Sequence, residues 1–452
     1  MTLTLVLALA LQALTIYLLR RFLGRNWLTH PFALMLLAAT VYHGFGELLM
    51  LTPGALATNP YRMMLTPDEV HRGALVISGG MLATTAGYLW AVRRRGLVTT
   101  DRSQEGAAMA PLDWRILVLC LIPLAAATYS GEGFTTAEVL DSRNQSSIQV
   151  LAMSLFVMLM TLTTFSVIWR FGSRSFVPVM AANVLLLAAA GQRLEIAVSA
   201  ITVWAMLGFM RRLPRTRDLI ILVVIGAACA FAITSVRSAQ GREIFNTDSG
   251  LESRVSAIVN AFGSTAADTV SGGDLITQTA VRLDSNEWAG HVVLALSQGT
   301  EPMGLTAVVR SMSQAVPSFL NPSKNSGDVT DRSSEAAQIW YYGMPDNDHL
   351  PGHFGLWLGL TGIALYFPVM GFFGYLYGRL ERWIFARVST ARLLTLILLL
   401  IGSLFVERGI PSLIIMLRYA IPLGILGFVA QRLWPRLSNT PAVPSHRLTS
   451  SS

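Results

Sequence analysis

Charged residues, lysine and cysteine are all scarce in this chain of 452 residues. Only 13% of its residues are charged, about half the share of a typical soluble globular protein. Lys324 is the only lysine, so all the other residues among the 34 basic ones are arginines. The two cysteines, Cys120 and Cys229, lie inside apolar runs. Their positions exclude a disulfide framework, a cysteine-based metal cluster and a thiol nucleophile at a polar site.

The sequence is rich in long apolar runs. The hydrophobic share is 53%, mean hydropathy is +0.52, and many runs approach the roughly 20 residues that cross a bilayer. The sequence therefore predicts an all-α polytopic membrane protein. The first run lacks a preceding charge and a small-residue cleavage site, so we expect a retained helix and not a signal peptide. We expect about eleven transmembrane helices, at residues 2–19, 31–51, 72–92, 114–129, 147–169, 176–191, 194–210, 218–236, 353–377, 392–407 and 411–431.

Arginines gather in every second connection between these helices. The positive-inside rule places such connections in the cytoplasm, which predicts an N-terminus outside and a C-terminus inside. Because the excess basic charge lies in these short loops, it does not indicate a nucleic-acid partner. The arginine-rich connections hold Arg20, Arg21 and Arg25; Arg93, Arg94, Arg95, Arg102 and Arg115; Arg170 and Arg174; Arg211, Arg212, Arg215 and Arg217; and Arg379, Arg382, Arg387 and Arg392.

This topology divides the chain into four parts. Residues 1–236 form helices one to eight, residues 237–352 a large external loop, residues 353–431 helices nine to eleven, and residues 432–452 a disordered cytoplasmic tail. Periodicity predicts two helical pieces in the external loop, at 251–270 and 275–296. The sequence shows no internal repeat, which disfavours a transporter built from inverted repeats.

The apolar run from Phe176 to Met210 contains a cation, Arg193. A single helix over this run would be about 52 Å long, whereas the hydrocarbon layer is about 30 Å thick. The run must therefore fold back, and Gly191 with Gln192 is the permissive place. This turn lies at the outer face in the expected topology. Arg193 is therefore either a functional residue there or a structural one, which snorkels to lipid headgroups or pairs with Glu47 or Glu407.

Several polar groups are candidates for proton transfer on the outer side. Asp284, Glu287 and His291 have the spacing of one helical face, which is also the ordinary wet face of an amphipathic helix. Asp346, His349 and His353 form a competing set, although Asp346 and Asn347 also suit a tight turn. His43 and Glu47, one turn apart, form a structural pair or line an outer cavity. Arg418 lies deep in the eleventh expected helix, as an ion-pair member or a substrate contact.

Three patches of the sequence resemble the O-antigen polymerase and ligase family of bacterial envelope glycosyltransferases. The first is the Gly191-Gln192-Arg193 turn. The second is the stretch 281–306, which carries Arg282, Trp288, Pro302 and Gly304. The third is 346–363, where Asn347, Leu350, Gly359 and Gly362 match, while Asp346 stands where many relatives place a histidine. The layout of eleven helices with one large external loop is also similar.

The resemblance implies inverting glycosyl transfer on the periplasmic face of the bacterial inner membrane, without a metal, a nucleotide sugar or any other cofactor. The donor would be an oligosaccharide on a polyprenyl pyrophosphate, and a chain-length regulator and a flippase are candidate protein partners. Arg193, Arg237, Arg282 and Arg408 would bind the diphosphate, because guanidinium grips phosphate oxygens in a bidentate way. A general base would come from Asp284, His291, Asp346, His349 or His353.

Three functions remain open at this stage. A polymerase would join lipid-linked repeat units of a surface polysaccharide, either O-antigen or exopolysaccharide. An O-antigen ligase would transfer the same glycan to a lipid A core. A transporter or flippase for lipid-linked sugars would instead need broken helices and ionisable residues deep in the bundle. Most outer charge gathers at the mouth of the bundle, which favours surface chemistry over translocation. The polymerase is our leading prediction, and nothing in the sequence fixes the acceptor.

Overall fold

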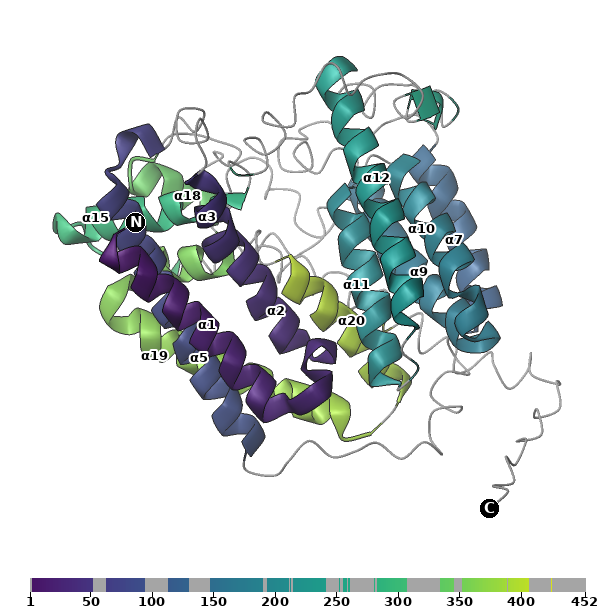
Figure 1. Ribbon diagram of the computed structural model, residues 1–452, viewed down its shortest axis with the longest axis horizontal. Helices are drawn as coiled ribbons and strands as arrows, with labels where there is room; N and C mark the ends of the chain where they lie inside the picture. The colour runs from purple at the N-terminus through teal and green to yellow at the C-terminus, as the bar shows by residue number, and fades with distance from the viewer. Residues whose placement is uncertain are drawn as a thin grey trace.

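The computed structural model describes residues 2–51, 62–93, 113–129, 147–189, 193–240, 283–306, 334–344 and 352–405, apart from single positions within these ranges, and a few isolated residues besides. Every regular element in these ranges is a helix (Figure 1). The helices form two bundles, each with its own cluster of buried apolar side chains. By length and composition, four of the described helices can cross a membrane: Leu3–Leu23, Pro31–Met50, Pro67–Arg93 and Gly352–Phe385. The prediction of an all-helical membrane protein is supported at this level.

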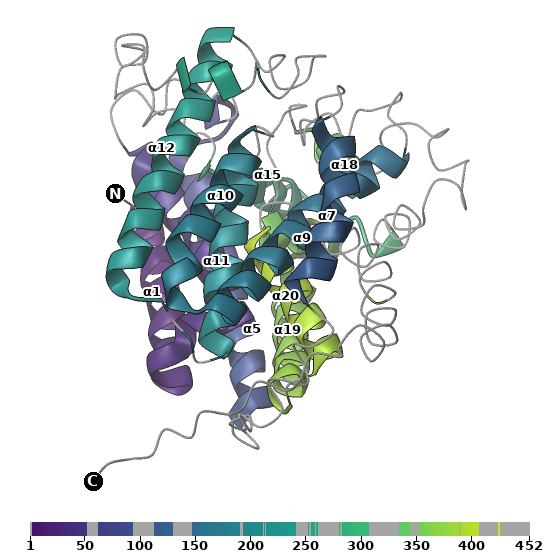
Figure 2. The same ribbon diagram turned by 90° about the vertical axis from the view of Figure 1, so that its right-hand side faces the viewer.

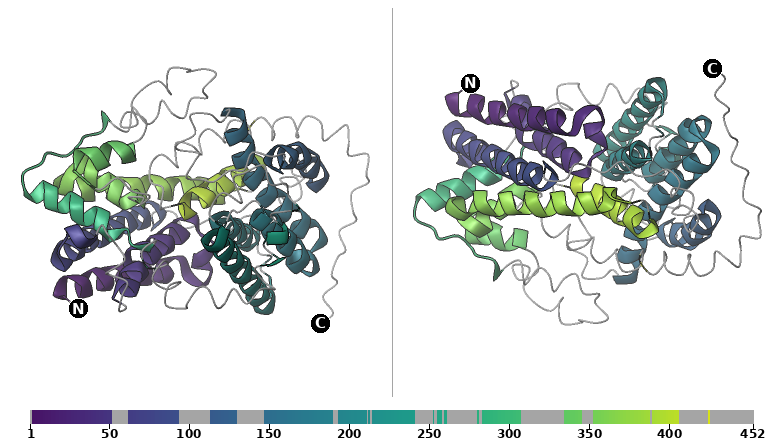
Figure 3. Two further views of the ribbon diagram at one scale, coloured as in Figure 1. Left: turned by 90° about the horizontal axis from the view of Figure 1, so that it is seen from above. Right: turned by 90° about the horizontal axis from the view of Figure 1, so that it is seen from below.

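The first bundle, which carries the site described below, contains α1 (Leu3–Leu23), α2 (Pro31–Thr40), α3 (Gly46–Met50), α5 (Pro67–Arg93) and α19 (Gly352–Phe385). A π-helical turn, η2 (Val41–Phe45), joins α2 to α3 without ending the span. Helices α5 and α19 pack closely because glycines face backbone: a Cβ at Gly87 would meet the Gly371 carbonyl, and one at Gly374 would meet that of Thr84. Figure 3 shows α19 running alongside the purple N-terminal helices.

The second bundle contains α7 (Trp114–Tyr129), α9 (Ser147–Phe171), α10 (Phe176–Ala189), α11 (Arg193–Phe209) and α12 (Thr216–Gln240), which lie side by side in Figure 2. Helix α20 (Thr390–Leu404) packs on both α2 and α11 and so joins the bundles. Short 3₁₀ turns, η1 (Gly24–Thr29), η3 (Arg62–Met64) and η6 (Ser173–Ser175), lie at helix ends. The expected fold-back of the apolar run from residue 176 to residue 210 is confirmed, because α10 and α11 pack together and Ser199 Oγ donates to Asn183 Oδ1 at 3.3 Å.

Two short helices lie at one end of the first bundle. Helix α15 (Asn286–Ser297) packs against the beginning of α5, and α18 (Ser334–Tyr341) packs against α19. We call this the α15 end, and the opposite end, where α5 stops, the Arg93 end. The predicted helix at 275–296 is wrong in one respect, because Asp284 and Ser285 are not helical and α15 begins only at Asn286. Asp284 is therefore not on the helix face that carries Glu287 and His291.

Helix α19 reverses direction at Gly362. This glycine has φ +67° and ψ +169°, which is outside the helical region. The ring of His353 lies 4.6 Å from that of Phe373, twenty residues later, although a straight helix would separate them by about 30 Å. Residues 352–361 therefore fold back along residues 363–373. The expected ninth span at 353–377 is corrected: only 363–385 traverses the bundle, and a glycine at positive φ allows the reversal.

Candidate functional site

The structure places the residues expected to act on protons in different surroundings. Asp284 and Glu287 are buried, with 2% and 3% of their surface exposed, which excludes a wet helix face for both. His291 is partly exposed on α15, and His353 is buried in the folded-back arm of α19. Asp346 and His349 lie outside the described residues.

The expected diphosphate-binding arginines are less fully described. Arg193 is the first residue of α11 and Arg237 lies in the last turns of α12, but their side chains are outside the described part of the chain. Arg282 and Arg408 lie outside it altogether, as do Asn347, Arg418 and the eleventh expected helix apart from Gly424. Their roles stay predictions. Glu195 is buried at the start of α11.

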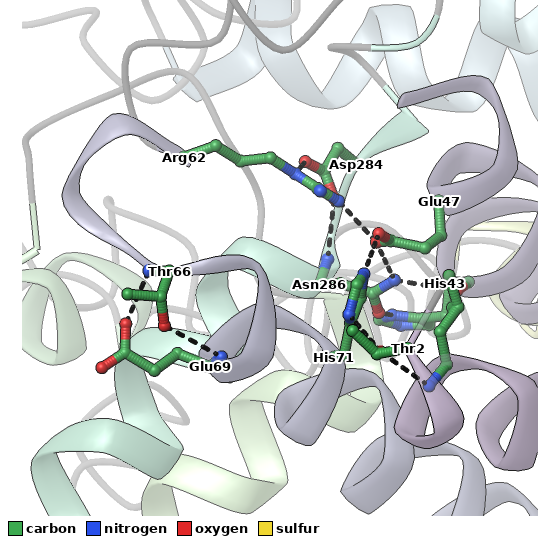
Figure 4. Close-up of polar contacts among 10 residues, drawn as sticks. Thr2, His43, Glu47, Arg62, Thr66, Glu69, His71, Asp284 and Asn286 are labelled. Atoms are coloured by element: carbon green, nitrogen blue, oxygen red, sulfur yellow. Dashed lines mark hydrogen bonds and ion pairs between the residues drawn. The ribbon is translucent and has the colours of Figure 1, made fainter. Parts of the chain in front are cut away.

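A buried ionic centre at the α15 end is the main polar feature of the first bundle (Figure 4). Arg62 in η3 binds Asp284 in a bidentate way, with Nε 2.5 Å from Oδ2 and Nη2 3.0 Å from Oδ1. Its Nη2 also donates to Glu47 Oε2 on α3, at 2.5 Å. One guanidinium thus joins two carboxylates from segments more than 200 residues apart. Bidentate charge-assisted bonds of this kind fix orientation strongly.

Asn286, the first residue of α15, connects this centre to His43 in η2. Its Nδ2 donates to Glu47 Oε2 at 3.0 Å and to the backbone carbonyl of His43 at 2.8 Å. Its Oδ1 lies 3.0 Å from His43 Nδ1. Asn286 is fully buried and His43 is 1% exposed. Helix α15 is therefore fixed to the α2–α3 span by side-chain bonds at its first turn.

His71 on α5 completes the group. Its Nε2 lies 3.3 Å from Glu47 Oε1, and its Nδ1 lies 2.7 Å from the hydroxyl of Thr2 at the start of α1. Glu47 therefore has contacts to Arg62, His71 and Asn286 at once. We call Glu47, Arg62, His71, Asp284, Asn286 and His43 the outer network.

Close backbone contacts hold the segment around Asp284 in place. A Cβ at Gly46 would meet the carbonyl of Leu283, and one at Gly73 would meet the backbone nitrogen of Gly290. Glycines on α3 and α5 thus let the chain before α15, and α15 itself, approach the bundle within backbone contact. This approach brings the Asp284 carboxylate within reach of Arg62.

Burial dominates the electrostatics of Asp284. Desolvation raises the pKa of its carboxyl from 3.8 to about 6, against the lowering effect of Arg62, and the nearby acids Glu287 and Glu47 raise it further. Burial opposes the charge of Arg62, but Asp284 and Glu47 raise the pKa of its guanidinium above the ordinary value, so Arg62 stays charged. The outer network therefore combines a permanent cation with a carboxyl that titrates about two units above its usual range.

The folded-back arm of α19 is held by the strap 301–304, which follows α15. The backbone N–H groups of Met303 and Gly304 donate to the carbonyls of Gly359 and Leu360, at 3.2 Å and 3.0 Å. A Cβ on Gly362 would lie 2.5 Å from Pro302 Cγ. The strap satisfies carbonyls that the reversal at Gly362 removes from helical bonding.

Helix α18 makes a second connection between α15 and this arm. Gln338 accepts from Trp288 Nε1 at 3.3 Å and donates through Nε2 to the carbonyl of Leu356 at 2.8 Å. The hydroxyl of Tyr342 donates to the carbonyl of Gly359 at 2.5 Å, and burial raises the pKa of this phenol to about 12, so it stays protonated. Trp288, Pro302, Gly304, Gly359 and Gly362, which lie in separate patches of the sequence, thus belong to one packed unit.

Comparison with known proteins adds no family to this picture, because no family model, curated protein or solved structure matches the chain. Within the described residues, no group of three or more His, Cys, Asp or Glu side chains is arranged to hold a metal ion.

Sequence reasoning missed Arg62 and Asn286 as members of the site. Arg62 lies between two expected helices and carries no periodic signal, and Asn286 looks like an ordinary residue of the expected helix at 275–296. A weaker signal was present: His43 and Glu47 are ionisable residues one turn apart in an apolar span, and such residues require partners. Those partners come from the loop before α5 and from the segment before α15.

Proposed function

We propose that this protein is an inverting, metal-independent glycosyltransferase of a bacterial inner membrane. It polymerises oligosaccharide repeat units of a surface polysaccharide, each carried on a polyprenyl pyrophosphate. The α15 end faces the periplasm, where the donor's diphosphate lies at the membrane surface. The acceptor hydroxyl belongs to a second lipid-linked glycan.

One observation carries this proposal: two of the three patches that resemble the O-antigen polymerase and ligase family are folded into contact. The strap with Pro302 and Gly304 lies on the Gly359–Gly362 turn, and Trp288 is connected to the same arm through Gln338. Patches that are some 60 residues apart in the sequence have no reason to meet if each were an independent loop. Their contact is what a shared site requires.

The chemistry of the α15 end suits group transfer from a diphosphate. A departing lipid diphosphate gains charge, and preorganised guanidinium groups stabilise such charge. Arg193, at the beginning of α11, and Arg282, two residues before Asp284, remain our candidates for this role. Arg62 is not a candidate for this role, because its guanidinium already donates to the carboxylates of Asp284 and Glu47.

The deciding experiment is turnover of a defined donor by the purified protein in proteoliposomes. With a synthetic polyprenyl-diphosphate oligosaccharide as the only glycan, a polymerase forms products of two, three and more repeat units and releases polyprenyl diphosphate. An O-antigen ligase would form nothing until a lipid A core acceptor is added. Absence of product under both conditions would contradict a glycosyltransferase of either kind.

A transporter of lipid-linked sugars is the second candidate, and the broken helix α19 is the observation that favours it. Broken helices in transporters present free backbone groups to substrates and ions. Here the carbonyls of Gly359 and Leu360 already accept bonds from Met303, Gly304 and Tyr342. This occupancy favours a structural reversal over a transport site. Movement of intact donor across the proteoliposome membrane without new glycosidic bonds would support the transporter instead.

A further inference from the structure

The hydrogen bonds around Asn286 define which nitrogen of His43 carries a proton. The side-chain NH₂ of Asn286 faces two acceptors, the Glu47 carboxylate and the His43 carbonyl. A flipped amide would set its oxygen against both of them, so Oδ1 must be the atom that faces His43 Nδ1. An amide oxygen only accepts, and His43 Nδ1 must therefore be the donor. In the neutral imidazole, Nε2 then carries the lone pair.

This lone pair is buried and has no hydrogen-bond partner in the described part of the chain. No polar atom of the described residues makes a hydrogen bond with His43 Nε2, and the side chain is 1% exposed. Leaving a buried acceptor unsatisfied destabilises the folded protein, because its bonds to water are lost and not replaced. His71, in the same network, differs, because its two nitrogens contact Thr2 and Glu47. A group that bonds to His43 Nε2 during function would offset the cost.

The position of His43 also connects the outer network to the folded-back arm of α19. Its ring meets the edge of Phe354 at 6.4 Å, and Phe354 in turn contacts the ring of His353 at 5.6 Å. His43 lies in the π turn η2, and such turns are frequent at functional sites. The imidazole is thus held between α15 and the arm, the two elements that carry the resembling patches.

We propose that His43 is the general base of the glycosyl transfer and that Asn286 is its positioning residue. This inference rests on the proposed function and deepens it. The acceptor hydroxyl donates its proton to His43 Nε2 while its oxygen attacks the anomeric carbon of the donor. The bond from that carbon to the diphosphate oxygen breaks, and polyprenyl diphosphate leaves with the electron pair. The imidazolium returns its proton to water before the next turn.

The surrounding charges support this role. Glu47 lies behind Asn286, two hydrogen bonds away from the imidazole, so a positive ring gains a nearby counter-charge. The other titratable groups of the outer network are Arg62, His71 and Asp284, and His353 lies beyond Phe354. A histidine oriented by an amide oxygen through one nitrogen keeps the second nitrogen as an acceptor, which is the role of a general base.

The test compares His43→Gln with His71→Gln in the proteoliposome assay with the polyprenyl-diphosphate oligosaccharide. Both are buried histidines of one network, but only His43 has an unpartnered nitrogen. We expect kcat to fall about 10²–10⁴-fold in His43→Gln, the usual contribution of a general base, and less than about tenfold in His71→Gln. Asn286→Ala should lower kcat with little change in KM. A His43→Gln protein with more than a tenth of wild-type kcat, or equal losses in both variants, would overturn the proposal.

The pH profile of the wild-type protein decides the matter if His43→Gln does not fold. A single essential base makes kcat fall about tenfold per pH unit on the acid side, and this limb should persist in Asp284→Asn. A wild-type profile that stays flat down to the pH at which the protein unfolds, or loss of the acid limb in Asp284→Asn, would assign the proton elsewhere. Wild-type protein without any turnover would instead contradict the proposed function itself.

Discussion

Two fully buried carboxylates, Glu47 at the α15 end and Glu381 at the Arg93 end of the first bundle, are stabilised in different ways. Glu381 accepts from the hydroxyl of Tyr88 and, at 3.3 Å, from the backbone N–H of Phe32, while His30 Nδ1 lies 3.5 Å away. Glu47 contacts the guanidinium of Arg62, the ring of His71 and the amide of Asn286. Of these two carboxylates, only Glu47 has an arginine among the described residues as its ion-pair partner.

The difference follows from what each carboxylate holds together. The carboxylate of Glu381, on α19, lies beside the beginning of α2, where the first N–H groups lack helical partners. It therefore caps α2 and interacts favourably with the positive end of the helix dipole. Its partners lie on α5 and at the start of α2. Glu47 instead shares Arg62 with Asp284, which belongs to the segment before α15. A cap needs only neutral donors, whereas a centre that gathers several acids needs a permanent cation.

The most direct test of this difference between Glu47 and Glu381 is to remove the guanidinium of Arg62. In Arg62→Met, Glu47 and Asp284 remain buried without their counter-charge, and breaking a buried ion pair in this way costs about 3–5 kcal/mol. We expect a large fall in thermal stability of the detergent-solubilised protein, measured by unfolding monitored with tryptophan fluorescence or a thiol-reactive dye.

The control for Arg62→Met is the double variant Arg62→Met with Asp284→Asn. It removes one of the two orphaned charges together with the cation, so most of the lost stability should return. If the single variant is as stable as the wild type, the centre has water access and the guanidinium is not its organising group.

The all-helical character followed from hydropathy, but the site did not. The break between Ala189 and Arg193 was predictable because an unbroken helix would be too long for the bilayer. The reversal at Gly362 was not, because a glycine inside an apolar helix gives no sign of its φ until Pro302 is placed against it. In the same way, the sequence indicated that Asp284 was an exposed helix residue, because its partner Arg62 is 222 positions away. Local periodicity carries no information on such a pairing.

The pH dependence of stability sharpens the comparison through Asp284. Its pKa is raised by burial to about 6, so the folded state holds a proton that the unfolded chain releases near 3.8. The contribution is therefore favourable below about pH 4 and is lost as the pH rises through about 6. We expect the stability of the wild type to fall over this window, as measured by thermal unfolding at several pH values. Asp284→Asn should show a smaller fall, and an identical slope in both proteins would show that Asp284 does not titrate there.

The smallest effect should come from the Arg93 end, with Glu381→Gln. The amide oxygen can still accept from Phe32 N–H, and its NH₂ can donate to the Tyr88 hydroxyl, which reverses its own role. The loss is then the difference between charged and neutral hydrogen bonds, about 1–2 kcal/mol. Thermal unfolding of Glu381→Gln beside Arg62→Met measures both ends in one assay. A loss as large as that of Arg62→Met would mean that the charge of Glu381, and not its hydrogen-bonding capacity, stabilises the start of α2. The two carboxylates would then be ionic centres of the same kind, and the distinction between a cap and a site would no longer hold.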